Sequence, residues 1–405
     1  MSIKNSVFRL TGKVQHYQWG GFDYIPRLLG ISNNKHQPYA EYWLGAHDNA
    51  PAQLESGESL NEFFRKHPDR LGPVAQKQFG RLPYLLKILD VKDMLSIQVH
   101  PNKKAAVIEF EKENKAGVPL NAPNRNYKDD NHKPELMTAL SDFWLLHGFL
   151  PADKLVASIT AIPEFAFMIP VFEKGSYKAL YELLMTMEQS KVNAILRPLL
   201  QRIIPLYEAG GLNKNGPDFW AARAALTFNE GDAIDRGIFS IYLFNIVYLK
   251  KGEAIFQDAG ILHAYLEGQN VEIMANSDNV LRGGLTPKHI DVAELMKHVL
   301  FEPIEPNIIH GSPVSASEQV FSTPAPDFEL SKITLAAGEA YPLTVASADI
   351  FLVLEGTVEI SPAPDQPLFS KGEAFIAVNG SNIILQSTTG AAIYRASVPQ
   401  TAIGQ

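Results

Sequence analysis

A six-residue stretch near the middle of the chain recurs close to its end, and this repeat limits the folds that the sequence can adopt. Lys251–Phe256 returns as Lys371–Ile376, and a further glycine follows at the same distance in each copy. Because self-similar segments mark repeated structural units, we expect two copies of one β unit. His263 follows the first copy, whereas Ile383 stands at the equivalent place in the second, so the second copy is predicted to be structural.

Strand patterns surround both copies of the repeat. Aliphatic residues alternate with other side chains from Ile88 to His100, which predicts a strand, a tight turn and a second strand. Strand character returns in Phe239–Leu249, and a proline-rich segment, 303–326, is typical of a linker between domains. Short strands typical of a small β-sandwich or barrel follow it, and they are predicted at Ile350–Leu354, Thr357–Ile360, Ala374–Val378, Asn382–Leu385 and Ala391–Arg395.

A helical pattern interrupts the strands between Pro151 and Thr227. Charged residues fall mostly between the apolar ones there, so we predict an amphipathic helical domain inserted between β segments. The apolar positions at helical spacing are Tyr177, Leu180, Tyr181, Leu184, Met187, Val192, Ile195, Leu196, Leu199 and Leu200.

Composition excludes several classes of protein. The chain has 405 residues, of which 46% are hydrophobic, so it is long enough for two or three domains. A net charge of −8 without any basic cluster disfavours nucleic-acid binding. There are no cysteines, so a metal would need histidine, carboxylate or amide ligands. The sequence shows neither a secretory signal nor a membrane-spanning run, and we expect a cytoplasmic protein.

The segment before Pro101 is the first candidate for binding a metal. Ser96, Gln98 and His100 share one side of the predicted strand, because side chains alternate along a strand. An amide oxygen and an imidazole two residues apart can reach one ion. Taken alone, such a pair more often marks a polar strand face that is satisfied by its neighbours.

Two further segments complete the candidate site. Pro134 keeps the chain extended beside Glu135 and places Lys133 on the same face, although an isolated pair of this kind is more often a surface ion pair. His263 enters a strand through a glycine turn, where a single histidine is more often a core residue. In sum, two imidazoles, a carboxylate and an amide match a four-ligand site for zinc or another divalent ion.

A dense polar run from Glu272 to Lys288 indicates a place for an anion. Arg282 and Lys288 bring positive charge to an acidic protein, and the glycines after Arg282 let the backbone approach a ligand closely. This combination suits a phosphate group. A turn-rich connection with a Gly-Gly hairpin explains the same residues about as well.

Together, these segments resemble the type I mannose-6-phosphate isomerases, or phosphomannose isomerases. The resemblance runs in order from residue 10 to about residue 300 and weakens in the helical block and the last third of the chain. The matching motifs are Gln15–Gly20, Ala40–His47, Leu82–Lys87, Leu95–Lys103, Tyr127–Leu136 and Glu272–Lys288.

The resemblance implies a mainly β fold, in which two cupin-like (jelly-roll) β domains flank an inserted α-helical domain. We expect a catalytic domain from 1–150 with 228–302, a helical insertion over 151–227, and a C-terminal domain over 303–405 that lacks a metal site. It also implies one Zn²⁺ per chain, and the implied roles are metal binding by Gln98, His100, Glu135 and His263, phosphate contacts from Ser96, Lys288 and Arg282, a catalytic role for Arg282, and further pocket positions at Lys133, Glu272 and Asp278.

The implied reaction interconverts D-mannose 6-phosphate and D-fructose 6-phosphate by moving a proton between C1 and C2 through an enediol. Such a transfer needs an acid/base group and a partner for the developing oxyanion. Zinc can polarise the oxygens, and Arg282 can stabilise charge but is a poor base, because its pKa is too high. The candidate bases are Glu272, which we favour, and Asp278, Lys133 and His132.

A metal-binding cupin of another class is the alternative, either a dioxygenase or a non-catalytic sugar-phosphate-binding protein. A dioxygenase would be expected to hold iron on two histidines and one carboxylate, and the Gln98 amide with its neighbouring cations fits that poorly. A binding protein would keep affinity for the sugar phosphate without turnover. We expect a monomer that binds a small-molecule sugar phosphate and has no nucleic-acid or membrane partner.

Overall fold

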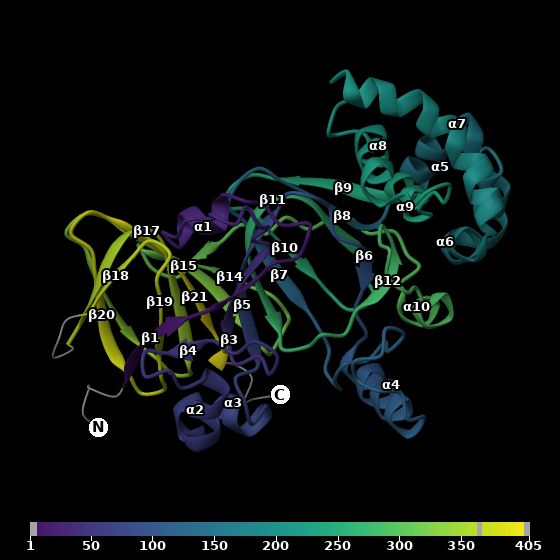
Figure 1. Cartoon of the computed structure of the whole chain (residues 1–405). Coiled ribbons are helices and arrows are strands. Elements are labelled where there is room, and N and C mark those ends of the chain that lie inside the picture. Colours follow the sequence, from purple (N-terminus) through teal and green to yellow (C-terminus); the bar gives the residue numbers. More distant parts are fainter. Residues whose placement is uncertain (1–5, 363–366, 401–405) are drawn as a thin grey trace.

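Two antiparallel β-sheets lie side by side in the computed structural model, which describes residues 6–362 and 367–400 (Figure 1). The first sheet has ten strands, which are β2 (Lys13–Gln15), β3 (Glu41–Gly45), β5 (Tyr84–Val91), β6 (Ile97–Val99), β7 (Glu135–Ala139), β8 (Phe143–Phe149), β9 (Phe244–Leu249), β10 (Ala254–Gln257), β11 (His263–Ala275) and β12 (Leu281–Gly284). The second has eleven, which are β1 (Val7–Thr11), β4 (Gln53–Leu54), β13 (Ser312–Pro313), β14 (Glu318–Phe321), β15 (Glu329–Leu335), β16 (Ala340–Thr344), β17 (Asp349–Ser361), β18 (Leu368–Ser370), β19 (Ala374–Ala377), β20 (Asn382–Gln386) and β21 (Ala391–Ser397).

A helical segment, α5–α9, packs on the end of the first sheet that faces away from the second sheet (Figure 1). Its helices are α5 (Ala152–Thr160), α6 (Met168–Thr186), α7 (Gln189–Glu208), α8 (Pro217–Phe228) and α9 (Gly237–Leu243). The predicted apolar positions, such as Tyr181 and Leu196, are buried in one core with strand residues such as Ile97. Two sheets with a helical segment confirm the predicted fold class.

Five further α-helices of the described residues lie outside this segment. They are α1 (Tyr24–Leu28), α2 (Leu60–Lys66), α3 (Pro73–Gln78), α4 (Lys103–Lys115) and α10 (Val292–His298). Within the described residues, no helix is both long enough and apolar enough for a membrane span.

The strand predicted over Phe239–Leu249 is wrong in its first half, which belongs to the helix α9. Every residue of α9 is buried, because the helix packs between α5, α8 and β12. A segment that is apolar on all sides shows neither helical nor strand periodicity, so packing decided its structure. Its second half forms β9, as predicted.

The structure corrects two further predictions for the last third of the chain. The strands expected at Ile350–Leu354 and Thr357–Ile360 form one strand, β17, with a register shift between Val353 and Glu355. The proline-rich segment, expected as a linker, carries β13 and β14, and Ile309 forms a bridge with Ala254. Since extended backbone can pair at a sheet edge in spite of its prolines, composition alone did not reveal these contacts.

The sequence repeat returns as a structural repeat. Gly252 and Gly372 both have a positive φ, of 93° and 86°, a conformation that favours glycine. The carboxylate of Glu253 accepts a hydrogen bond from the backbone N–H three residues before it, and that of Glu373 does the same. The strand after each turn then pairs with an equivalent neighbour, β10 with β7 and β19 with β17.

The N-terminal strand β1 belongs to a different sheet from the strands β2 and β3 that follow it. β1 and β4 pair with each other, and β1 also pairs with β19, so both belong to the second sheet. The predicted domain limits of 1–150 with 228–302, 151–227 and 303–405 stay a prediction.

Candidate metal centre

Three of the four predicted metal ligands meet in the first sheet. His100 directly follows β6, Glu135 begins β7 and His263 begins β11. The Nε2 atoms of His100 and His263 each lie 3.4 Å from a carboxylate oxygen of Glu135. All three residues are at most 1% exposed, and the three ligand atoms lie within 4.8 Å of one another.

Hydrogen bonds fix both imidazoles in the orientation that a metal ligand needs. Nδ1 of His100 donates to the carbonyl oxygen of Asn279 at 2.8 Å, and Nδ1 of His263 donates to that of Ile261 at 2.9 Å. Each proton therefore sits on Nδ1, which leaves the Nε2 lone pair free. Burial lowers the pKa of His100 to about 4, so its imidazole is neutral at physiological pH.

The three residues fit a divalent metal. Nε2 of His100, Nε2 of His263 and Oε2 of Glu135 are buried without a hydrogen-bond partner. Buried polar atoms without a partner are costly, and a shared cation would satisfy all three. Although burial opposes ionisation, Lys133 and His100 hold the pKa of Glu135 well below its usual range, so the carboxylate is charged. Two imidazoles and a carboxylate are a typical donor set for zinc.

Strand register brings the fourth predicted ligand and a cation to the same place. On β6, Gln98 pairs with His263 on one side and with Arg282 on the other. Residues directly opposite in antiparallel strands share a face, so the three side chains leave the sheet together. The Gln98 amide makes no hydrogen bond within the described part of the chain, so it is free for the predicted ligand role.

The predicted phosphate residues lie beyond Gln98. Burial lowers the pKa of Arg282, and burial together with Arg282 lowers that of Lys288, so these two cations are near one another. Neither side chain forms an ion pair with any described residue. Two close cations without a partner favour binding of an anion there. Ser96, half-buried, directly precedes β6.

A buried charge network beside the metal ligands contains residues that sequence reasoning missed. Nζ of Lys87 lies 3.0 Å from Glu272 and 3.6 Å from Glu41, and the Tyr265 hydroxyl donates to Glu272 at 2.9 Å. Although burial works against it, Glu272 and Glu41 raise the pKa of Lys87. The available signal was a single lysine in β5, whose residues are otherwise almost all apolar and all buried.

The candidate bases differ in whether they lie near the metal ligands. Burial raises the pKa of Glu272, while Lys87 opposes the rise. Lys133 contacts Glu135 at 2.9 Å and therefore also lies at the metal site. His132 does not, because its Nε2 contacts Asp327 of the last third at 2.8 Å. His132 is thus the one candidate base that the structure turns away from the site.

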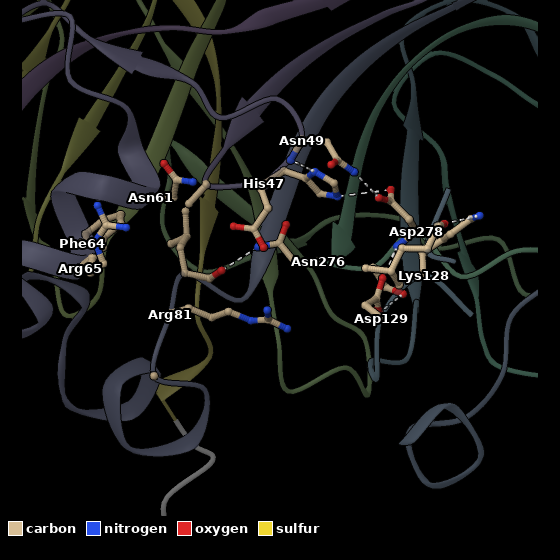
Figure 2. Close-up of a pocket in the computed structure, with 16 residues that line it drawn as sticks. His47, Asn49, Asn61, Phe64, Arg65, Arg81, Lys128, Asp129, Asn276 and Asp278 are labelled. Atoms are coloured by element: carbon tan, nitrogen blue, oxygen red, sulfur yellow. Dashed lines mark hydrogen bonds and ion pairs between the residues drawn. The ribbon is translucent and has the colours of Figure 1, made fainter. Parts of the chain in front are cut away.

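Asp278 lines a cavity of about 460 Å³ together with His47 and Asn49. Figure 2 shows the Asp278 carboxylate held by His47, at 3.3 Å, and by the Asn49 amide, at 2.8 Å. Although burial opposes it, the contact with His47 lowers the pKa of Asp278, and Lys133 and Lys87 contribute. Asp278 is thus within electrostatic reach of the catalytic candidates, and sequence reasoning missed its partner His47.

Comparison with known proteins agrees with this arrangement. Residues 7–152 match the model of the phosphomannose isomerase type I catalytic domain. The chain is 36% identical over 392 residues to mannose-6-phosphate isomerase of Escherichia coli (strain K12), a match that covers 93% of this chain and 96% of that protein.

This chain belongs to the type I phosphomannose isomerase family.

Other members of the phosphomannose isomerase family extend the match. The human mannose-6-phosphate isomerase is 35% identical over 412 residues, with 93% of this chain and 94% of that protein covered. A crystal structure of the Salmonella typhimurium mannose 6-phosphate isomerase, bound to its substrate fructose 6-phosphate and to zinc, superposes with a TM-score of 0.85 at 33% identity. That superposition covers 97% of this chain and 99% of the other, so the family fold extends over both sheets and the helical segment.

Proposed function

We propose that this chain is a zinc-dependent mannose-6-phosphate isomerase, which interconverts D-mannose 6-phosphate and D-fructose 6-phosphate. The observation that carries the proposal is the buried His100–Glu135–His263 set, whose three facing atoms have no partner. Membership of the phosphomannose isomerase family supports the same function, as do the zinc and the fructose 6-phosphate in the Salmonella structure.

Zinc would be held by His100, Glu135 and His263, with Gln98 as fourth ligand. When bound, it acts as a Lewis acid that polarises oxygens of the substrate and stabilises negative charge on them. The protein's own part is to hold both imidazoles with Nε2 toward the metal position, which the Nδ1–H bonds to backbone carbonyls achieve.

Proton transfer between C1 and C2 is assigned to Glu272. Its carboxylate lies in the buried charge network beside the metal ligands, and its pKa, raised by burial, moves toward the range of an efficient general base. Lys87 and Tyr265 fix its two oxygens, so the carboxylate is held in one orientation. Lys133 and Asp278 remain further pocket residues, which we assign to contacts with the sugar hydroxyls.

The phosphate is assigned to Ser96, Arg282 and Lys288. Arg282 lies next to β6, on the far side of Gln98 from His263, and it lowers the pKa of Lys288, the second unpaired cation. A dianionic phosphate would give both cations a partner, and Arg282 would also stabilise negative charge in the enediol.

The function is tested directly by supplying mannose 6-phosphate to the zinc-loaded protein and measuring fructose 6-phosphate with a coupled assay. We expect turnover that is lost on removing the metal with a chelator and restored by zinc, because Glu272 alone leaves the substrate oxygens unpolarised. Binding of the sugar phosphate with no turnover at any zinc loading would contradict the proposal and identify a binding protein.

Replacing Lys288 with alanine is expected to raise the KM for mannose 6-phosphate by about 10- to 100-fold with little change in kcat. The phosphate is remote from the reacting carbons, and a charge-assisted hydrogen bond contributes about 1.5–3 kcal/mol to binding. Steady-state kinetics measure both constants. Lys104→Ala, on exposed α4, is the matched control and should leave both unchanged; an unchanged KM in Lys288→Ala would remove Lys288 from the phosphate site.

We infer further that the chain works as a monomer in the cytoplasm. All of the proposed ligands and catalytic groups come from one chain, so no partner is required to complete the site. The absence of cysteine from the sequence suits a reducing compartment.

A further inference from the structure

Each proposed metal ligand of the first sheet has an equivalent in the second. Gln257 pairs with Glu135, and Ala377, at the same place in the second copy of the repeat, pairs with Asp349. Likewise, the N–H groups of the two repeated glycines, Gly260 and Gly380, donate to the carbonyl oxygens of His100 and Val345. By these pairings, Gln98, His100, Glu135 and His263 correspond in order to Leu343, Val345, Asp349 and Ile383.

Three of these four equivalents, Leu343, Val345 and Ile383, have apolar side chains, which cannot bind a metal ion. The carboxylate alone persists, as Asp349, and it is fully buried. A buried carboxylate needs a cation or several donors to stay ionised.

The same strand register extends to the charge network. In the first sheet, Glu272 pairs with Met137 on one neighbouring strand and with Lys87 on the other. In the second sheet, Arg395 pairs with the residue equivalent to Met137 and with the residue equivalent to Lys87. The network residues Glu41, Lys87 and Glu272 therefore correspond in order to Glu318, Ser331 and Arg395. Among these equivalents the second sheet thus keeps two carboxylates, and the one cation among them stands where the first sheet has the proposed base.

Arg395 connects the two remaining carboxylates. Its Nε and Nη2 donate to one oxygen of Asp349 at 2.8 and 2.6 Å, and its Nη1 donates to Glu318 at 3.1 Å. The other oxygens accept from hydroxyl groups, Asp349 from Ser347 and Glu318 from Tyr341. Every carboxylate oxygen therefore has a donor, unlike Oε2 of Glu135 in the first sheet.

We propose that the second sheet retains a cation site at the place equivalent to the metal centre, and that the guanidinium group of Arg395 is its permanent occupant. The ligand class is a planar guanidinium cation, because its fork of N–H donors matches two carboxylates, whereas a metal ion would find one carboxylate among apolar side chains. On this assignment the second sheet binds no metal ion at this place.

The test uses the full zinc-loaded protein with Arg395→Ala, which leaves Asp349 and Glu318 without their cation. We expect the melting temperature to fall by on the order of 5 °C or more, because removing one partner leaves buried charge uncompensated. Guanidinium chloride at low millimolar concentration should then raise the melting temperature of the variant and leave the wild type unchanged. Sodium chloride and urea at the same concentration are the controls and should have no such effect.

A second variant covers the case in which Arg395→Ala does not fold. It combines Arg395→Met with Glu318→Gln and Asp349→Asn, which removes the cation and both charges together. This protein should fold, keep its turnover and fail to respond to guanidinium, because no uncompensated charge remains. A failure of this variant to fold would overturn the proposal, since charge compensation would then not explain the need for Arg395.

Two further results would also overturn it. The first is that guanidinium leaves the melting temperature of a folded Arg395→Ala unchanged or lowers it as in the wild type. The second is a second zinc ion per chain in the wild type or in Arg395→Ala that is missing from the triple variant, since that would place a metal ion at Asp349 and Glu318.

Discussion

His263→Ala is expected to lose zinc and to lower turnover by at least about a thousandfold while the fold persists. The variant removes one of two buried imidazoles, and the charge stabilisation that a bound metal provides amounts to several kcal/mol, at about 1.4 kcal/mol for each factor of ten. A catalytic metal is less tied to folding than a structural one, so circular dichroism should remain close to that of the wild type. Metal analysis and the isomerase assay measure the two losses.

Ile383→Ala is the matched control, because Ile383 stands at the equivalent position in the second sheet. It should keep one zinc ion and full turnover, although the cavity lowers thermal stability. A His263→Ala protein that unfolds with its metal retained would show that the ligand assignment is wrong.

Glu272→Gln is expected to lower kcat by about 100- to 10,000-fold with zinc still bound, because an amide keeps the shape but cannot accept the proton. The wild type must have Glu272 ionised, so its rate should fall as the pH drops through the pKa of this group. Burial raises that pKa above the ordinary value of 4.5, which places the acid limb of the profile above pH 4.5. The residual rate of the variant should lack this limb.

Glu267→Gln provides the comparison for Glu272→Gln, since Glu267 lies on the same strand but pairs with Lys214 and Arg223 outside the site. It should keep the wild-type kcat and pH profile. A Glu272→Gln variant with unchanged kcat would move the base to Lys133 or Asp278.

Three of the candidate metal ligands, His100, Glu135 and His263, could be predicted to lie together because each stands in or beside a short extended segment. Pro134 before Glu135 and the glycine turn before His263 fix the local backbone, and the register then follows from the strands. Alternation alone placed Gln98 and His100 on one side of a strand.

The charge network around Lys87 could not be predicted, because nothing in the sequence near Lys87 points to Glu41 or Glu272. Those contacts depend on the order β3, β5, β11 in the sheet, which sequence periodicity does not give. For the same reason His47 remained hidden, since its partner Asp278 lies more than two hundred residues away. In α9 the periodicity itself was missing, because all seven residues are buried.

The pairing of β1 with β19 determines when the second sheet can fold during synthesis of the chain. Leu10 lies opposite Ala374, so a strand made among the first residues waits for one made among the last. Domains usually fold as they leave the ribosome, N-terminal parts first, but here the second sheet stays open until nearly the whole chain has been synthesised. An mRNA truncated after the helical segment would therefore encode a polypeptide in which β1 lacks its partner β19. Such an unpaired strand edge promotes aggregation and chaperone binding.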